Sequence, residues 1–130
     1  MILTTTLSAA AAAALINFWL MLRCGSVRTS ARIIHGDGGN SLLIKRMRAH
    51  ANFVESTPFV LILIGAIELA GKGGLWLSIV AGVYLLARVA HPLGMDRDTP
   101  NALRVGGIAI TMLTLIGLAV VAVLITLGKI

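Results

Sequence analysis

Residues Ile2 to Leu22, ILTTTLSAAAAAALINFWLML, contain no charged side chain. A hydrocarbon core about 30 Å thick is crossed by roughly 20 helical residues at about 1.5 Å each. This segment is therefore long enough to cross a membrane once as a helix. A cleaved signal peptide would carry basic residues before its apolar run, whereas Arg23 follows this one. We therefore expect a retained helix, whose run of alanines suits close helix packing in lipid.

The whole chain shares this apolar character. Of its 130 residues, 58% are hydrophobic and 12% are charged, whereas soluble domains are nearer half apolar and a quarter charged. This composition excludes an ordinary soluble domain and a disordered chain. The single cysteine excludes an internal disulfide, and three scattered histidines give no metal-ligand spacing. The sequence predicts one all-α transmembrane domain over residues 1–130, an integral membrane four-helix bundle.

Charge-free runs and turn residues divide the chain into four expected helices. Turn-forming residues cluster in the stretch HGDGGN, which begins at His35, and again between Gly71 and Gly74. A third polar stretch, from His91 to Pro100, contains two prolines. The expected helices span residues 2–34, 42–70, 75–90 and 101–127.

Polar residues near the ends of these helices predict local contacts. Ser41 and Asn101 are placed to cap the second and fourth helices at their N-termini. Glu68 and Lys72 are four residues apart, a spacing that favours an ion pair. Asn17 interrupts the first apolar run, where an amide side chain commonly forms a hydrogen bond to a neighbouring helix.

Basic residues are concentrated in the first and third loops. The chain has 11 Lys and Arg against 5 Asp and Glu, and few of the basic residues lie near the second loop or the C-terminus. Loops rich in Lys and Arg face the cytoplasm, so both termini are expected in the periplasm. Such loops meet the anionic headgroups of membrane lipids. Nucleic acid is not an expected partner, because no aromatic residues are interleaved with the basic ones.

The stretch from Arg48 to Glu55, RAHANFVE, carries the clearest chemical pattern. Arg48, Asn52 and Glu55 are spaced i, i+4 and i+7, so they share one helix face. Arg offers a planar fork for a carboxylate, Glu an acceptor for an ammonium, and Asn both a donor and an acceptor. The trio suits a zwitterionic ligand with several carboxylates. An intrahelical salt bridge that locks the packing of the bundle fits the spacing equally well.

This pattern resembles that of the MAPEG family, the membrane-associated proteins in eicosanoid and glutathione metabolism. The similar stretches are RMRAHANFVESTPFVLILIGAIEL from Arg46, GDGGN from Gly36, and YLLARVAHPLG from Tyr84. GDGGN is similar to the bacterial branch, and the length and four-helix layout also agree. The resemblance implies a location in a bacterial inner membrane.

The resemblance also implies an assembly and a ligand. It implies a homotrimer with glutathione in a cleft between subunits. Arg48 would bind a glutathione carboxylate, Asn52 its backbone amide region and Glu55 its ammonium. Arg104, near the start of the fourth helix, would favour the thiolate as the catalytic residue, because a nearby cation lowers a thiol pKa.

Further residues near the expected site are candidates with weaker support. His91 lies in the region for glutathione, and Arg28 and Arg32 are one turn apart and able to reach a ligand carboxylate or to anchor the loop. The chain departs from eukaryotic relatives in carrying Ser56 after the motif Glu, and Met95 and His91 where those relatives place tyrosines. The sequence leaves open the roles of Arg88, Arg97 and Cys24.

The expected function is a glutathione-dependent transferase or peroxidase that acts on lipophilic small molecules entering from the bilayer. One alternative is a non-catalytic membrane scaffold that binds glutathione or lipid, which would form no thiolate. A second alternative is a small proton-coupled exporter, since such proteins also combine four short helices with a membrane Glu. The position of Glu55 near the basic end of its helix, and not at mid-bilayer, weighs against the exporter.

Overall fold

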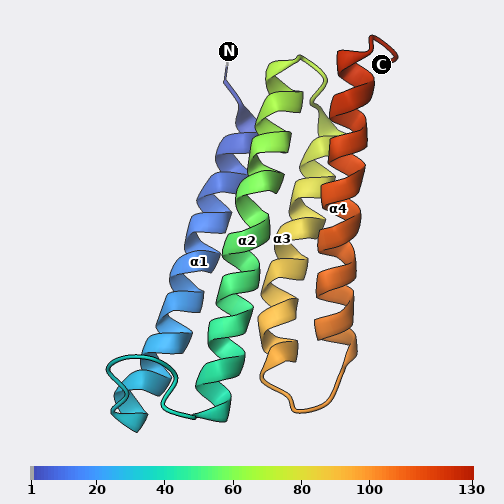
Figure 1. The fold of residues 1–130 in the computed structure, drawn as a ribbon. Coiled ribbons are helices and arrows are strands. Elements are labelled where there is room, and N and C mark those ends of the chain that lie inside the picture. Colours follow the sequence, from blue (N-terminus) through green and yellow to red (C-terminus); the bar gives the residue numbers. More distant parts are fainter. Residues whose placement is uncertain (1) are drawn as a thin grey trace.

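The computed structural model describes residues 2–130 as four long helices joined by three short loops (Figure 1). The helices are α1 (Thr4–Ala31), α2 (Ser41–Leu69), α3 (Leu75–Met95) and α4 (Ala102–Thr126). Each is long and apolar enough to cross a membrane, and no strand occurs between residues 2 and 130. The predicted all-α fold with four helices capable of crossing a membrane is confirmed.

The helices run up and down, so both ends of the chain lie at the same end of the bundle (Figure 1). α3 packs most extensively on α4, and α1 on α2, while α2 also contacts both α3 and α4. The main core lies where these helices meet and is formed by Ala9, Val60, Ile64, Ile67, Leu77, Ala81, Tyr84 and Leu118. Large apolar side chains such as Phe18, Phe59 and Leu86 are exposed on the outside, as expected for a surface that faces lipid.

Asparagine side chains begin two of the helices. The side chain of Asn101 accepts a hydrogen bond from the backbone N–H of Arg104 at 3.2 Å, which confirms it as the cap of α4. The expected cap of α2 was wrong by one residue. Asn40, not Ser41, has the extended backbone of a cap, and its side chain accepts from Leu43 N at 2.9 Å.

The ends of α1 and α3 differ from the expected bounds. α1 stops at Ala31, because Arg32 adopts a left-handed backbone with φ of 56° and the N–H of Ile33 bonds back to Arg28. α3 continues through Pro92 to Met95, five residues past the expected end. Proline removes only its own N–H from the helix. The last turn is further held because Asn101 Nδ2 donates to the carbonyl of Gly94 at 2.9 Å.

Glu68 supplies the missing cap of α1 from another helix. α1 has no side-chain cap of its own. The Glu68 carboxylate accepts from the backbone N–H of Thr5 at 3.0 Å and from the N–H and hydroxyl of Thr6 at 2.8 and 2.6 Å. The expected ion pair between Glu68 and Lys72 is therefore wrong. Free N–H groups and the positive end of the helix dipole attract a carboxylate more effectively than a mobile lysine nearby.

Replacing Glu68 by Gln tests this cap. Gln keeps one acceptor but places an NH₂ group against N–H and O–H donors, so we expect the unfolding temperature in detergent to fall by a few degrees. Lys72→Gln is the matched control and is expected to change it little, because exposed charges on flexible chains contribute little. Equal unfolding temperatures for the two variants would contradict the capping role.

Candidate functional site

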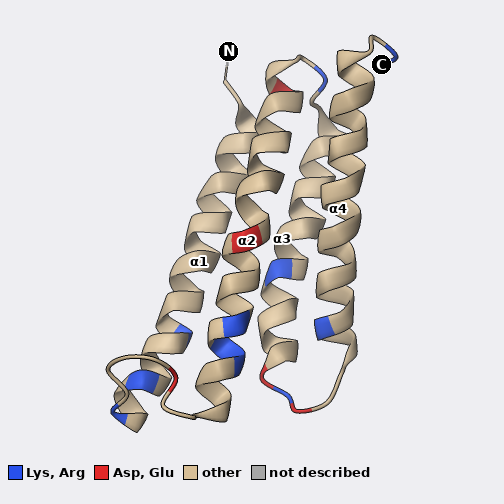
Figure 2. Cartoon of the chain, in the orientation of Figure 1, with Lys and Arg blue, Asp and Glu red and all other residues tan. Residues whose placement is uncertain are grey.

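Lys and Arg residues gather at one end of the bundle, where the loops α1–α2 and α3–α4 lie (Figure 2). Asp96, at the end of α3, accepts from Arg23 of α1 at 2.5 Å and from Arg46 of α2 at 3.2 Å. Lys45 of α2 forms a second ion pair with Asp98 in the same loop. These pairs tie the α3–α4 loop to the first two helices.

The two acidic residues of this loop differ in their surroundings. The Asp96 side chain is 27% exposed, whereas that of Asp98 is 87% exposed. The hydrogen bond and the charge of Lys45 lower the pKa of the Asp98 carboxyl from its ordinary value. The pair therefore contributes above the ordinary pKa of an Asp, and its contribution is lost as the pH falls through the lower folded-state value. Because the pair is exposed, the contribution is small.

A hollow of about 340 Å³ opens at this basic end. It is lined from α2, α3 and α4 by Arg48, Asn52, His91, Met95, Arg104 and Ile108. Four of the residues singled out in the sequence therefore meet at one place, although they come from three different helices. The longer α3 explains why His91 takes part, because it places this residue on a helix face three positions after Arg88.

Arg88 is buried between the helices and holds Asn52, one of the residues that line the hollow, in place. Its side chain is 1% exposed. It donates to Asn52 Oδ1 on α2 at 2.6 Å and to the backbone carbonyl of Gly107 on α4 at 3.0 Å. The sequence left the role of Arg88 open, and the structure pairs it with Asn52. In the sequence, the signal for this role was the position of Arg88 one helical turn before His91.

The hollow presents donors to a ligand. With its carbonyl oxygen engaged by Arg88, Asn52 offers chiefly its NH₂ group to a ligand. The guanidinium groups of Arg48 and Arg104 lie at its exposed edge. His91 is 5% exposed, and its Nδ1 atom has no hydrogen-bond partner within residues 2–130. Two cations and an amide donor favour an anionic ligand rich in acceptor oxygens.

Glu55 does not line this hollow. It is exposed on the surface of α2, and among the described residues no ion pair with it occurs. The other two candidates also lie elsewhere. Arg28 donates to the carbonyl of Gly36 at 2.7 Å, and Arg32 ends α1. Their proposed contacts with a ligand remain predictions.

The remaining polar side chains between the helices have structural partners. Asn17 of α1 forms a hydrogen bond with His50 of α2 at 2.8 Å, which confirms the expected interhelical contact. The hydroxyl of Tyr84 bonds to that of Thr57 at 2.8 Å in the buried seam between α2 and α3. The single tyrosine of the chain thus stabilises the bundle and does not line the hollow.

The pattern on α2 and the four-helix layout correspond to a known family, whose profile matches residues 6–124. The chain belongs to the MAPEG family. It is 36% identical over 69 residues to the inner membrane protein YecN of Escherichia coli K12, and equally to YecN of Escherichia coli strain CFT073. The aligned part covers 52% of this chain and 52% of each relative. The chain thus spans about half the length of the curated relatives it matches.

In this MAPEG chain, Gly107 allows α3 and α4 to meet closely beside the hollow. A Cβ atom at this position would lie 2.6 Å from the Cβ of His91 and 3.0 Å from the carbonyl oxygen of Ala87. Real side chains do not approach so closely. Glycine therefore permits both the position of His91 and the hydrogen bond from Arg88 to the carbonyl of Gly107.

We expect Gly107→Ala to destabilise the protein by about 1–3 kcal/mol, the usual cost of overpacking a close contact. The change should also displace His91 and weaken anion binding at the hollow. Gly106→Ala is the matched control, because a Cβ atom there meets nothing within 4 Å. Chemical unfolding and calorimetric titration with a carboxylate ligand measure both effects. Equal behaviour of the two variants would show that α3 and α4 do not meet at Gly107.

Proposed function

We propose that this MAPEG protein is a membrane-embedded glutathione-dependent transferase or peroxidase that acts on lipophilic electrophiles. The observation that carries the proposal is the meeting of Arg48, Asn52, His91 and Arg104 around one hollow at the basic end of the helices. Glutathione is acidic and polar and carries a thiol. A donor-lined hollow at a membrane edge suits such a ligand, while the surrounding helix surface suits an apolar second substrate.

Each residue has a distinct role in the proposed reaction. Arg48 binds a carboxylate of glutathione, and the NH₂ group of Asn52 donates to an amide carbonyl. Arg104 lies beside the sulfur and favours its ionised form, which is the nucleophile. The polar thiol enters from the water side and the electrophile from the bilayer. Holding both in reacting geometry removes much of the entropic barrier to a reaction between two phases.

We further propose that the active unit is a homotrimer. Glu55 is exposed on a helix that crosses the membrane, and a carboxylate at such a place needs a partner or a polar cavity. A cleft shared with a neighbouring subunit would provide the cavity, and the ammonium of glutathione would provide the partner. The distribution of basic residues, with the inner-membrane relatives, supports an inner-membrane protein whose basic end faces the cytoplasm.

One feature of the hollow favours a second candidate, a protein that binds glutathione without catalysis. Met95 lines the hollow where eukaryotic relatives place a tyrosine, and Tyr84 is engaged elsewhere. The hollow thus has no phenolic hydroxyl to place near the sulfur. Formation of the thiolate, visible as an ultraviolet difference band when glutathione is added, distinguishes the enzyme from the binding protein.

The role of Glu55 is tested by native mass spectrometry of the protein in mild detergent with glutathione. We expect trimers that carry glutathione. In Glu55→Gln, the trimer should persist while the affinity falls by about 1.5–3 kcal/mol, the value of a hydrogen bond to a charged group. A monomer would overturn the proposed assembly. Loss of the trimer with normal binding by the remainder would assign Glu55 a structural role instead.

The role of Arg104 is tested by separating binding from thiolate formation. We expect Arg104→Ala to bind glutathione nearly as well as the parent protein, because carboxylates and ammonium dominate the affinity. Without the Arg104 cation the thiol pKa should rise, and the thiolate at neutral pH should fall roughly tenfold for each unit of that rise. Arg104→Lys should restore part of the thiolate. Arg97→Ala is the control and should leave thiolate formation unchanged. The reverse pattern would place the activating charge on the α3–α4 loop.

A further inference from the structure

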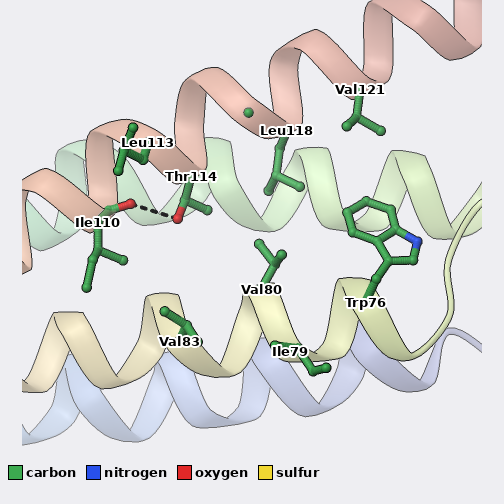
Figure 3. A pocket seen from close by; sticks show the side chains of 10 residues that line it. Trp76, Ile79, Val80, Val83, Ile110, Leu113, Thr114, Leu118 and Val121 are labelled. Atoms are coloured by element: carbon green, nitrogen blue, oxygen red, sulfur yellow. Dashed lines mark hydrogen bonds between the residues drawn. The ribbon is translucent and has the colours of Figure 1, made fainter.

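A long apolar groove runs between α3 and α4 on the outside of the bundle. One stretch of about 420 Å³ extends from Trp76 and Val121 to Ile110, and a second of about 360 Å³ continues from Ile110 to Leu103. Val83 and Ile110 line both stretches, so the two stretches adjoin along the α3–α4 seam. Figure 3 shows side chains from both helices around the first stretch. None of its lining residues belongs to the hollow described above.

The groove contains no free polar group for a polar ligand to use. The hydroxyl of Thr114 donates to the carbonyl of Ile110 at 2.7 Å, as the dashed line in Figure 3 marks. The indole N–H of Trp76 donates to the carbonyl of Lys72 at 3.2 Å. The other side chains are aliphatic or absent. A hydrocarbon chain can therefore fill this groove without depriving any polar group of a hydrogen bond.

The dimensions of the groove fit a single alkyl chain. From Trp76 to Ala90 it follows α3 for about 21 Å at about 1.5 Å per residue. Spread over this length, the two volumes make the groove narrower than a helix, which is about 10–12 Å wide. A helix of a second copy could insert only a row of side chains. A single extended acyl chain of a phospholipid is about as long as the groove, so it can lie there as a whole and reach Trp76 from the basic end.

The loop at the basic end of the groove carries a positive charge that forms no ion pair with the described residues. Ala102 and Leu103 line its basic end, directly after the α3–α4 loop. In this loop Asp96 pairs with arginines of α1 and α2, and Asp98 pairs with Lys45. Arg97 between them is exposed and forms no ion pair with any described residue. The acidic neighbours of Arg97 are thus neutralised by other helices, and its own charge remains for an anion.

We propose that the α3–α4 groove binds one acyl chain of an anionic phospholipid, whose headgroup phosphate lies at Arg97. The apolar lining and the narrowness of the groove favour a hydrocarbon chain. The free guanidinium of Arg97 favours a negatively charged headgroup. This lipid site does not depend on the proposed reaction with glutathione.

Quenching of Trp76 by brominated lipid tests the proposal in reconstituted vesicles. A Trp19→Phe background leaves Trp76 as the only tryptophan. Phosphatidylglycerol brominated near the chain end, as a minor share in phosphatidylcholine, should quench Trp76 at least twofold more than the same share of brominated phosphatidylcholine. Arg97→Gln should remove most of this preference. Equal quenching by the two lipids would overturn the proposal.

Two variants that block the groove distinguish lipid bound in the groove from anionic lipid that the basic surface attracts without a site. A Cβ atom at Gly117 or at Gly106 meets nothing within 4 Å, so Leu at either position enters open space. Gly117→Leu and Gly106→Leu should each abolish the excess quenching. Gly82→Leu is the matched control, because that glycine is equally open but lines a different hollow, between α1 and α3. Excess quenching that survives both blocking variants, or dissociation of the oligomer caused by either, would refute a lipid site.

Discussion

The buried guanidinium of Arg88 determines how three of the four helices meet. A charge inside a bilayer is costly unless it is paired or bonded. Arg88 therefore requires Asn52 of α2 and the carbonyl of Gly107 of α4 within hydrogen-bond reach. The carbonyl of Gly107 can accept a hydrogen bond from Arg88 because the absence of a side chain at Gly107 lets α4 approach α3. The same bonds turn the amide of Asn52 toward the hollow and hold His91, one turn further along α3, at its inner wall.

The two ends of the bundle are stabilised by different chemistry. At the basic end, Asp96 joins α1, α2 and the last loop through ion pairs. At the opposite end, Glu68 caps α1, and the hydroxyls of Thr5 and Ser78 bond to each other at 2.8 Å. Between the ends the core is mainly apolar, with buried polar contacts such as that of Tyr84 with Thr57 and that of Arg88 with Asn52. The cations that suit an anionic ligand lie at the basic end. Apart from exposed polar residues such as Glu55, the sides of the bundle offer mainly hydrocarbon surfaces to their surroundings.

The fold could be predicted from the sequence to within a few residues, because charge-free runs and turn residues are local properties. Arg48 and Asn52 could also be named, since their spacing places them on one helix face, whereas Arg104 and His91 were named from the resemblance to the MAPEG family. Contacts between segments that are distant in the sequence could not be predicted. Glu68 was expected to bind Lys72 four residues away and instead binds Thr5 and Thr6 more than sixty residues earlier. Such partners depend on how the helices pack, which no local pattern specifies.

Arg88 also bears on how the protein enters the membrane during synthesis. α4 is the most apolar of the four helices. Placing an arginine at the centre of a single inserting helix costs about 2.5–3.5 kcal/mol on insertion scales. The acceptor at Gly107 and the strongest hydrophobic segment both lie on α4, which is synthesised directly afterwards. Insertion of α3 and α4 together as one hairpin would give Arg88 its acceptor on α4 and so reduce this cost.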